Sequence, residues 1–212
     1  MTIDVKICGL SDEAALAAAV EGGAAMAGFV FFPPSPRYVT PERAGELTKG
    51  VPEGVIAVGL VVDADDALLS EIVEKAGLGM LQLHGKETPE RVLEIRERFD
   101  LPVMKVLPVA EAEDLSAIKE YEFVAERLMF DAKPPVGADR PGGNARPFDW
   151  SLLSRVHCKQ AWMLAGGLTA ENVGEAVKIS GARAVDVSSG VEDAPGRKNV
   201  EKIRAFLAAA AA

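Results

Sequence analysis

The 212-residue sequence has few cysteines, few histidines and no excess of positive charge. Two cysteines, Cys8 and Cys158, are too few for a disulfide framework, which fits a reducing compartment. The two histidines and two cysteines are scattered and do not form a zinc pattern, so we expect no metal site. Because 23 basic side chains face 32 acidic ones, the overall field is unsuited to nucleic-acid backbones or anionic lipid. A local site can still oppose that field and bind an anionic small molecule.

Long hydrophobic runs are absent as well. No apolar run approaches the roughly 18 residues that a membrane-spanning helix needs. The N-terminus, Met-Thr-Ile-Asp-Val-Lys, lacks the basic region and apolar stretch of a signal peptide. We therefore expect a cytoplasmic protein with no nucleic-acid and no membrane partner. With 49% hydrophobic and 26% charged residues, the composition is typical of one globular domain, which we expect to span residues 1–212.

Short apolar runs alternate with amphipathic segments along the chain. Continuous apolar stretches of about four to eight residues are typical of parallel strands covered on both faces. Eight strands are predicted, at 3–7, 28–32, 55–62, 80–83, 103–107, 128–131, 161–164 and 184–187. Capping patterns predict helices at 11–21, from 40 onward, and at 65–76, 88–99, 111–121, 169–180 and 199–211, with a short helix from 148.

This alternation predicts an α/β fold, a single-domain (β/α)8 TIM barrel. Eight units in 212 residues leave about 26 residues each, near the lower limit for such a barrel. A doubly wound open sheet is the alternative, but it usually needs fewer strands, and its glycine fingerprint is missing after the first strand. The sixth connection, 132–147, is rich in Pro and Gly and is predicted to be a long mobile loop.

The ends of the seventh and eighth predicted strands are suited to binding phosphate. Barrel chemistry lies at the carboxyl ends of the strands, and loops seven and eight commonly bind phosphate through backbone N–H groups. The candidate residues are Gly166, Gly167, Ser188, Ser189 and Gly190. A pair of tight turns is the alternative. Asp186, just before them, could accept a hydrogen bond from a sugar hydroxyl or hold the loop.

Cys8 and Asp131 end the first and sixth predicted strands and form a candidate acid–base pair. A thiol is a useful base only where positive charge or amide dipoles stabilise its thiolate, and strand alternation puts Lys6 on the same face as Cys8. The alternatives are a small buried cysteine and an aspartate that caps a helix or holds a loop. On opposite parts of one rim, the two groups could act as general base and general acid.

Two further polar residues stand near strand ends. Arg37 follows a proline-stiffened loop and could bind a carboxylate through two parallel hydrogen bonds, or be a solvated surface arginine. His84 is interpreted as a hydrogen-bonded structural histidine, with a general base as the alternative. His157 and Cys158 precede strand seven, at the opposite end of the barrel, and are assigned no function.

Eight motifs, most of them at predicted strand ends, follow one another along the chain. They are KICGL at 6–10, GFVFFPPSPRYV at 28–39, LQLHG at 81–85, FDAK at 130–133, GGNARPFDW at 142–150, LAGGLTAENV at 164–173, DVSSGVE at 186–192 and PGRK at 195–198. Together they resemble the phosphoribosylanthranilate isomerase family of tryptophan biosynthesis. The resemblance implies a barrel without cofactor or metal, a small phosphorylated substrate and a monomer or homodimer.

The resemblance also implies an Amadori rearrangement of N-(5-phosphoribosyl)anthranilate. In this mechanism Asp131 protonates the sugar ring oxygen, Cys8 removes the C2 hydrogen and Arg37 binds the anthranilate carboxylate. The loops after strands seven and eight hold the phosphate. Asp131 must start protonated, so we expect either burial that favours the protonated form or titration coupled to Cys8.

Three rival functions remain open. The related ProFAR isomerase of histidine biosynthesis acts on a bisphosphorylated substrate and resembles a two-aspartate enzyme. Here Cys8 replaces the first aspartate, and strands two to four lack a second Gly/Ser anion loop. A lyase or synthase would need a lysine or glutamate at a strand end, which Lys105 and Lys133 leave open. A catalytically silent barrel that binds a phosphorylated ligand is the third.

Overall fold

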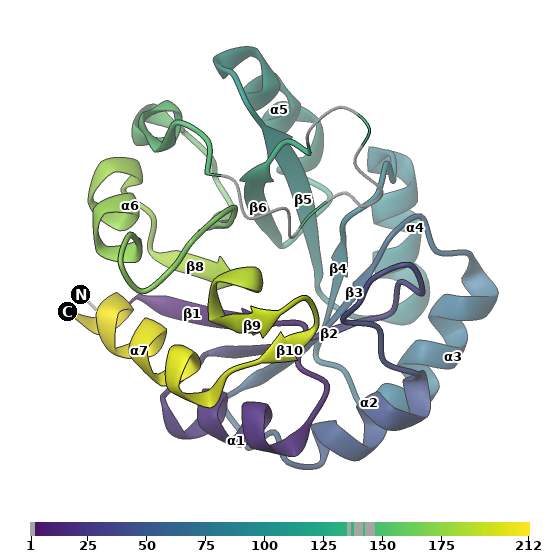
Figure 1. Ribbon diagram of the computed structural model, residues 1–212. Coiled ribbons are helices and arrows are strands. Elements are labelled where there is room, and N and C mark those ends of the chain that lie inside the picture. Colours follow the sequence, from purple (N-terminus) through teal and green to yellow (C-terminus); the bar gives the residue numbers. More distant parts are fainter. Residues whose placement is uncertain (1–2, 135–136, 138–141, 143–146) are drawn as a thin grey trace.

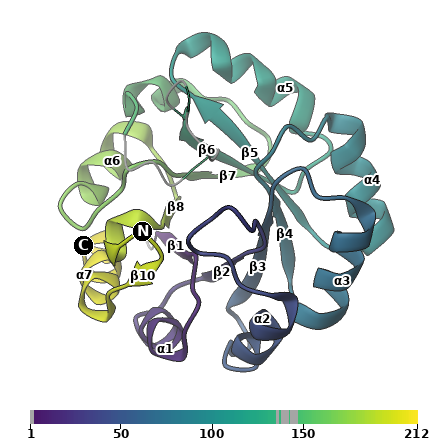
Figure 2. The same cartoon turned by 45° about the vertical axis from the view of Figure 1, so that its right-hand side comes forward.

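Eight parallel strands close into a barrel in sequence order, from β1 to β8 (Figures 1 and 2). The structure is a computed structural model that describes residues 3–134, 137, 142 and 147–212. The strands are β1 (Asp4–Cys8), β2 (Met26–Val30), β3 (Ile56–Val61), β4 (Met80–Leu83), β5 (Val103–Val109), β6 (Arg127–Ala132), β7 (Ala161–Leu164) and β8 (Ala184–Val187). β8 pairs with β1 to close the ring. The predicted TIM barrel is confirmed.

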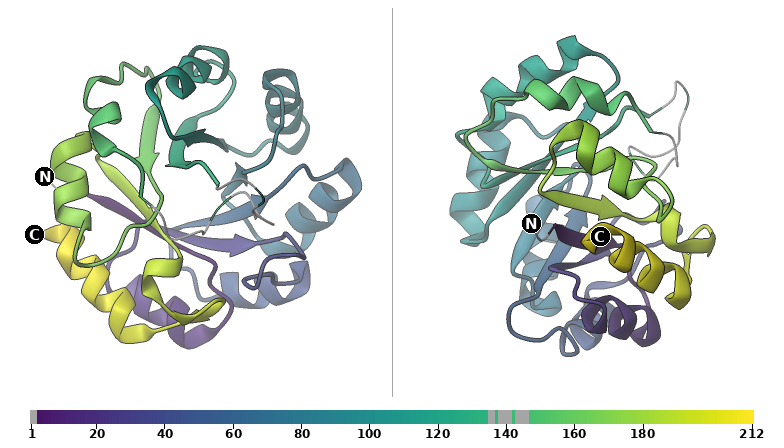
Figure 3. Two further views of the ribbon diagram at one scale, coloured as in Figure 1. Left: turned by 45° about the horizontal axis from the view of Figure 1, so that its top comes forward. Right: turned by 90° about the vertical axis from the view of Figure 1, so that its left-hand side faces the viewer.

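Helices surround the barrel (Figure 3). They are α1 (Glu13–Glu21), α2 (Pro41–Thr48), α3 (Asp66–Ala76), α4 (Pro89–Phe99), α5 (Ile118–Tyr121), α6 (Val173–Ser180) and α7 (Val200–Ala211). Five of them begin after a polar side chain that accepts a backbone N–H of the first turn. These capping residues are Asp12, Thr40, Asp65, Thr88 and Asn199. No helix within the described ranges is both long and apolar enough to cross a bilayer.

Two predicted helices differ from what the structure contains. The segment predicted as one helix at 111–121 divides into a 3-10 helix, η1 (Ala112–Ala117), and the short α5. Helix α6 begins four residues later than predicted. The reason is that the Asn172 side chain accepts the Thr169 N–H and donates to the Gly167 carbonyl, which holds this segment as a turn. The short helix expected from 148 is the 3-10 helix η2 (Trp150–Arg155).

The interior of the barrel is closed at its amino-terminal end by packed side chains. Five methionines, together with Val58 and Val106, fill this layer. These methionines are Met26, Met80, Met104, Met129 and Met163. This buried layer lies beneath the carboxyl ends of the strands, the end at which barrels of this kind bind their ligands.

A small hairpin, absent from the sequence prediction, follows β8. It consists of β9 (Glu192–Ala194) and β10 (Arg197–Lys198), joined after the 3-10 helix η3 (Ser189–Val191) (Figure 1). Gly196 has φ +81° and lies so close to the Pro36 carbonyl that a side chain would collide with it. The hairpin therefore packs directly on the loop after β2. The predicted loop at 132–147 falls largely outside the described residues.

Candidate active site

A cavity of about 840 Å³, including its open mouth, lies at the carboxyl ends of the strands. Its lining contains both candidate catalytic residues, Cys8 and Asp131. It also contains Arg37, Gly166, Gly167, Asp186, Ser188 and Ser189. The remaining candidate, Gly190, lies behind the lining, where a side chain would collide with the Leu168 carbonyl. The fold therefore brings the residues singled out in the sequence to one site.

The cavity has an apolar side formed by β2, β3 and the loops that follow them. Its side chains are Val30, Phe32, Leu60 and Val62. Most of the lining residues from β6 to β8 and the loops after them are polar or glycine, with Ala132, Leu168 and Val187 among them. The two sides thus offer different chemistry, an aromatic or aliphatic surface opposite a set of hydrogen-bonding groups.

Cys8 is only 4% exposed, so its thiol titrates in a desolvated environment. Burial raises the pKa of the Cys8 thiol above its ordinary value, and the Lys6 ammonium opposes this rise. Burial alone would lower the pKa of Lys6, but Asp186 outweighs burial and holds this pKa above its usual range. Lys6 Nζ donates to Asp186 Oδ1 at 2.8 Å. The thiol therefore has a permanently charged ammonium on its own face of β1, as strand alternation predicts.

Arg37 is buried, which excludes the solvated surface arginine. Its Nε and Nη2 donate to Glu192 Oε1 and Oε2 at 2.7 and 2.8 Å. Burial alone would raise the pKa of Glu192, but the hydrogen bond from Arg37 and the charge of Lys198 hold it below its ordinary value. The Nε–Nη2 edge of the guanidinium is thus already bonded to Glu192. A ligand carboxylate cannot form two parallel hydrogen bonds with that edge. Among the described residues, Nη1 has no acceptor.

Glu192 and Lys198 were given no role in the sequence, although both lie in motifs that carry the family resemblance. Lys198 Nζ donates to Glu192 Oε1 at 2.8 Å and to the Ser188 carbonyl at 2.9 Å. The Ser188 hydroxyl donates to the Cys8 carbonyl at 3.1 Å. A continuous polar chain therefore runs from Arg37 to the end of β1. The Ser188 hydroxyl is therefore engaged within the protein, and its hydrogen is not free to be donated to a ligand.

Loops seven and eight present backbone N–H groups to the cavity. Gly166 and Gly167 have φ of +91° and +65°, the left-handed region that glycine adopts without strain. Within the described part of the chain, the N–H groups of Gly167, Ser189 and Gly190 have no acceptor. Unpaired N–H groups at a glycine turn and at the start of η3 are an arrangement that favours a bound anion.

Asp131 lies across the barrel from Cys8, at the end of β6, and is 7% exposed. Its Oδ1 accepts the Ala132 N–H at 2.8 Å. Its Oδ2 lies 3.3 Å from His84 Nε2. The burial expected for this carboxyl is therefore present, and His84 lines the same cavity.

A model of the N-(5'phosphoribosyl)anthranilate (PRA) isomerase family matches residues 5–209. The chain belongs to this family. It is 60% identical over 210 residues to the N-(5'-phosphoribosyl)anthranilate isomerase of Paramagnetospirillum magneticum, with 99% of this chain and 98% of the relative covered. PRA isomerase from Thermotoga maritima has a TM-score of 0.86 and 35% identity, with 99% and 98% covered. Another PRA isomerase structure, a complex with reduced 1-(o-carboxyphenylamino)-1-deoxyribulose 5-phosphate, has a TM-score of 0.83 and 34% identity, with the same coverage.

Membership of the PRA isomerase family makes the chain an isomerase of tryptophan biosynthesis. The lyase or synthase suggested by the strand-end lysines is not supported. Lys105 is buried outside the cavity lining, and its Nζ donates to Glu87 Oε2 and to the Gly85 carbonyl, both at 2.7 Å. Lys133 lines the mouth and pairs with Asp114 at 2.9 Å. Both ammonium groups serve as ion-pair partners.

The Lys105–Glu87 pair predicts a large loss of stability on replacing Lys105 by methionine. The two side chains are only 3% and 2% exposed, and removing one partner leaves a buried carboxylate uncompensated. We expect the free energy of unfolding to fall by about 3–5 kcal/mol, measured by urea denaturation followed by circular dichroism. The matched control is Lys133→Met, which removes an exposed pair and should change stability far less. An equal fall in the free energy of unfolding in both variants would contradict the expectation that the buried pair stabilises the fold more than the Lys133 pair does.

Proposed function

We propose that this chain converts N-(5'-phosphoribosyl)anthranilate into 1-(o-carboxyphenylamino)-1-deoxyribulose 5-phosphate by an Amadori rearrangement. The observation that carries the proposal is a cavity with a thiol and a carboxyl on opposite parts of its rim, an apolar side and a set of unpaired amides. The substrate has parts that match these features: an aromatic ring for the apolar side, a sugar carbon that loses its hydrogen between the thiol and the carboxyl, and a phosphate for the amides.

In the proposed reaction Asp131 acts as the general acid and Cys8 as the general base. Asp131 gives its proton to the ring oxygen of the ribose, and the C1–O bond breaks as the aryl nitrogen forms an iminium with C1. The iminium acidifies the C2 hydrogen, which the Cys8 thiolate removes to give an enolamine. The enolamine takes a proton at C1 and loses the C2 hydroxyl proton, which leaves the ketone.

The remaining candidates bind the substrate at a distance from the reacting carbons. The phosphate accepts N–H groups of Gly167, Ser189 and Gly190, and the anthranilate ring packs on the apolar side of the cavity. Arg37 offers Nη1 to the anthranilate carboxylate while Glu192 holds its other edge. Asp186 keeps one oxygen on Lys6 and offers the other to a sugar hydroxyl. Binding energy at the two ends then orients the reacting centre.

A bisphosphorylated substrate is a poorer match. Its second phosphate would lie against the β2–β3 side, where Val30, Phe32, Leu60 and Val62 provide no donor. The one guanidinium on that side, Arg37, is already neutralised by Glu192. ProFAR isomerase activity is therefore not supported by this cavity. The cytoplasmic location and the monomeric or homodimeric state stay predictions.

The test is turnover by the purified chain. Mixing it with N-(5'-phosphoribosyl)anthranilate should quench the substrate's anthranilate fluorescence at a rate proportional to enzyme concentration, above the rate without enzyme. The dephosphorylated substrate should react with kcat/KM lower by at least about 10²-fold, because it forgoes the amide contacts. No enzyme-dependent quenching would favour a silent ligand-binding barrel. Equal kcat/KM for both substrates would remove the phosphate site from the proposal.

A further inference from the structure

His84 is held against the proposed general acid. Its backbone N–H donates to the Val61 carbonyl at 2.9 Å, and its ring Nε2 lies 3.3 Å from Asp131 Oδ2. Each side chain is 10% exposed. Gly142 packs over this contact, since a Cβ there would lie 2.8 Å from Nε2 and 2.9 Å from Oδ2. The ring and the carboxyl are therefore shielded together from bulk water.

Gln82 lies beside the other nitrogen of the ring. It is fully buried in β4, and its Nε2 lies 3.4 Å from His84 Nδ1. Because an ionised carboxylate only accepts, the contact between Nε2 and Asp131 Oδ2 needs the ring hydrogen on Nε2. A neutral ring then carries its hydrogen on Nε2, the atom that faces Asp131. His84 is thereby arranged as a donor.

A donor at this place matches the charge that the proposed reaction creates. Once Asp131 has given its proton to the sugar, both of its oxygens share a negative charge. The Ala132 N–H already donates to Oδ1 at 2.8 Å, and the His84 ring supplies the donor for Oδ2. Donors in place before the reaction stabilise such charge without reorganisation, and long contacts in unliganded sites tighten when substrate binds. His84 keeps its own proton throughout.

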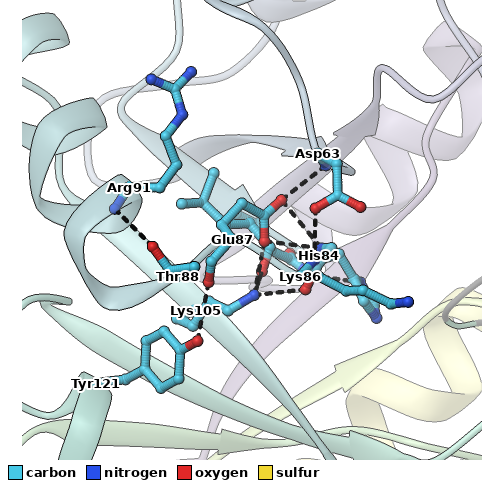
Figure 4. A network of polar contacts seen from close by, with 11 residues as sticks. Asp63, His84, Lys86, Glu87, Thr88, Arg91, Lys105 and Tyr121 are labelled. Carbon is cyan, nitrogen blue, oxygen red and sulfur yellow. Dashed lines mark hydrogen bonds and ion pairs between the residues drawn. The ribbon is translucent and has the colours of Figure 1, made fainter.

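The loop that carries His84 is fixed by a buried ion pair (Figure 4). Glu87 accepts the N–H of Asp63 at 2.9 Å and of Gly85 at 3.0 Å, and also accepts Lys105 Nζ at 2.7 Å. Lys105 in turn donates to the Gly85 carbonyl. The loop is thus bound to β5 through Lys105 and to the end of β3 through Asp63.

Two outer contacts complete this support (Figure 4). Asp63 Oδ1 accepts the Lys86 N–H at 2.6 Å, and the Tyr121 hydroxyl donates to the Glu87 carbonyl at 3.0 Å. Asp63 has φ +47°, which is unfavourable for a residue other than glycine. The hydrogen bonds on both its backbone and its side chain maintain that conformation. The loop after β4 is therefore a rigid base for the histidine.

We propose that His84 is a positioning residue: it orients Asp131 and stabilises the carboxylate left by proton transfer, on a loop that the Glu87–Lys105 pair fixes. The inference rests on the proposed role of Asp131 as general acid. It gives His84 a task distinct from that of a general base, because the ring neither gains nor loses a proton.

The test is a mutant cycle on kcat and KM with His84→Leu, Asp131→Asn and the double variant. We expect His84→Leu to lower kcat by about 10- to 100-fold with little change in KM. In the Asp131→Asn background the same substitution should change kcat by less than about twofold, because its partner is already altered. His84→Gln, whose amide can donate near the position of Nε2, should retain most of kcat and the wild-type pH profile. His157→Leu, at an exposed site outside the cavity, is the matched control and should leave kcat unchanged.

Each outcome decides between roles. Equal losses in His84→Gln and His84→Leu would show that the ring titrates during turnover and would overturn the inference. If His84→Leu lowers kcat in the Asp131→Asn background as much as it does alone, the inference about His84 is also overturned. Asp131 then remains the general acid. If Asp131→Asn alone keeps wild-type kcat, the proposed function fails instead. Circular dichroism of each variant separates these results from unfolding.

Discussion

Replacing Cys8 by serine should lower kcat by a factor of about 10²–10⁴ and leave KM nearly unchanged. A hydroxyl ionises far less readily than a thiol, so the base is lost, while the side chain keeps almost the same size. The Ser188 hydroxyl binds the Cys8 backbone carbonyl, and Lys6 pairs with Asp186, so the surrounding contacts do not depend on the sulfur. Initial rates from anthranilate fluorescence give kcat and KM.

Cys158→Ser is the matched control, because Cys158 lies outside the cavity lining and carries no proposed role. Its kcat should equal that of the wild type. A Cys8→Ser enzyme with kcat within about threefold of the wild type would exclude the thiol as the base.

Asp131→Asn should cause a loss of similar size, about 10²–10⁴ in kcat, and should change the shape of the pH profile. Wild-type turnover needs an ionised Cys8 and a protonated Asp131 together. In Asp131→Asn only the thiolate requirement remains, so residual kcat/KM should rise about tenfold per pH unit until the thiol has ionised. Because burial raises the pKa of Cys8, this rise should extend into the alkaline range.

The control for this variant is Asp4→Asn, at the start of β1 and at the opposite end of the barrel. It should keep both the wild-type rate and the wild-type profile. An Asp131→Asn enzyme whose rate and pH profile are unchanged would remove this carboxyl from the role of general acid.

The barrel was predictable because its strands are buried on both faces. Continuous apolar runs mark such strands, and turn and capping residues punctuate them, so each predicted strand has a counterpart in the structure. The β9–β10 hairpin was not predictable in this way. Its short strands carry charged residues, and they are held by Glu192 pairing with Arg37, 155 positions away. No local pattern encodes a contact of that kind.

The site was predictable where function follows from position at a strand end, as for Cys8 and Asp131. Polar residues inside apolar strands, Lys6, Gln82 and Lys105, were a signal for further buried contacts. Their partners lie on other strands and loops, which come into contact with them only when the barrel closes. For this reason the contact between His84 and Asp131 could not be predicted from the sequence. The sequence analysis interpreted His84 as a structural histidine.

The pairing of Arg37 with Glu192 has a consequence for biosynthesis of the chain. During synthesis Arg37 has no Glu192 to pair with until the chain has grown by a further 155 residues. This part of the pocket therefore cannot form before the residues after β8 have been synthesised.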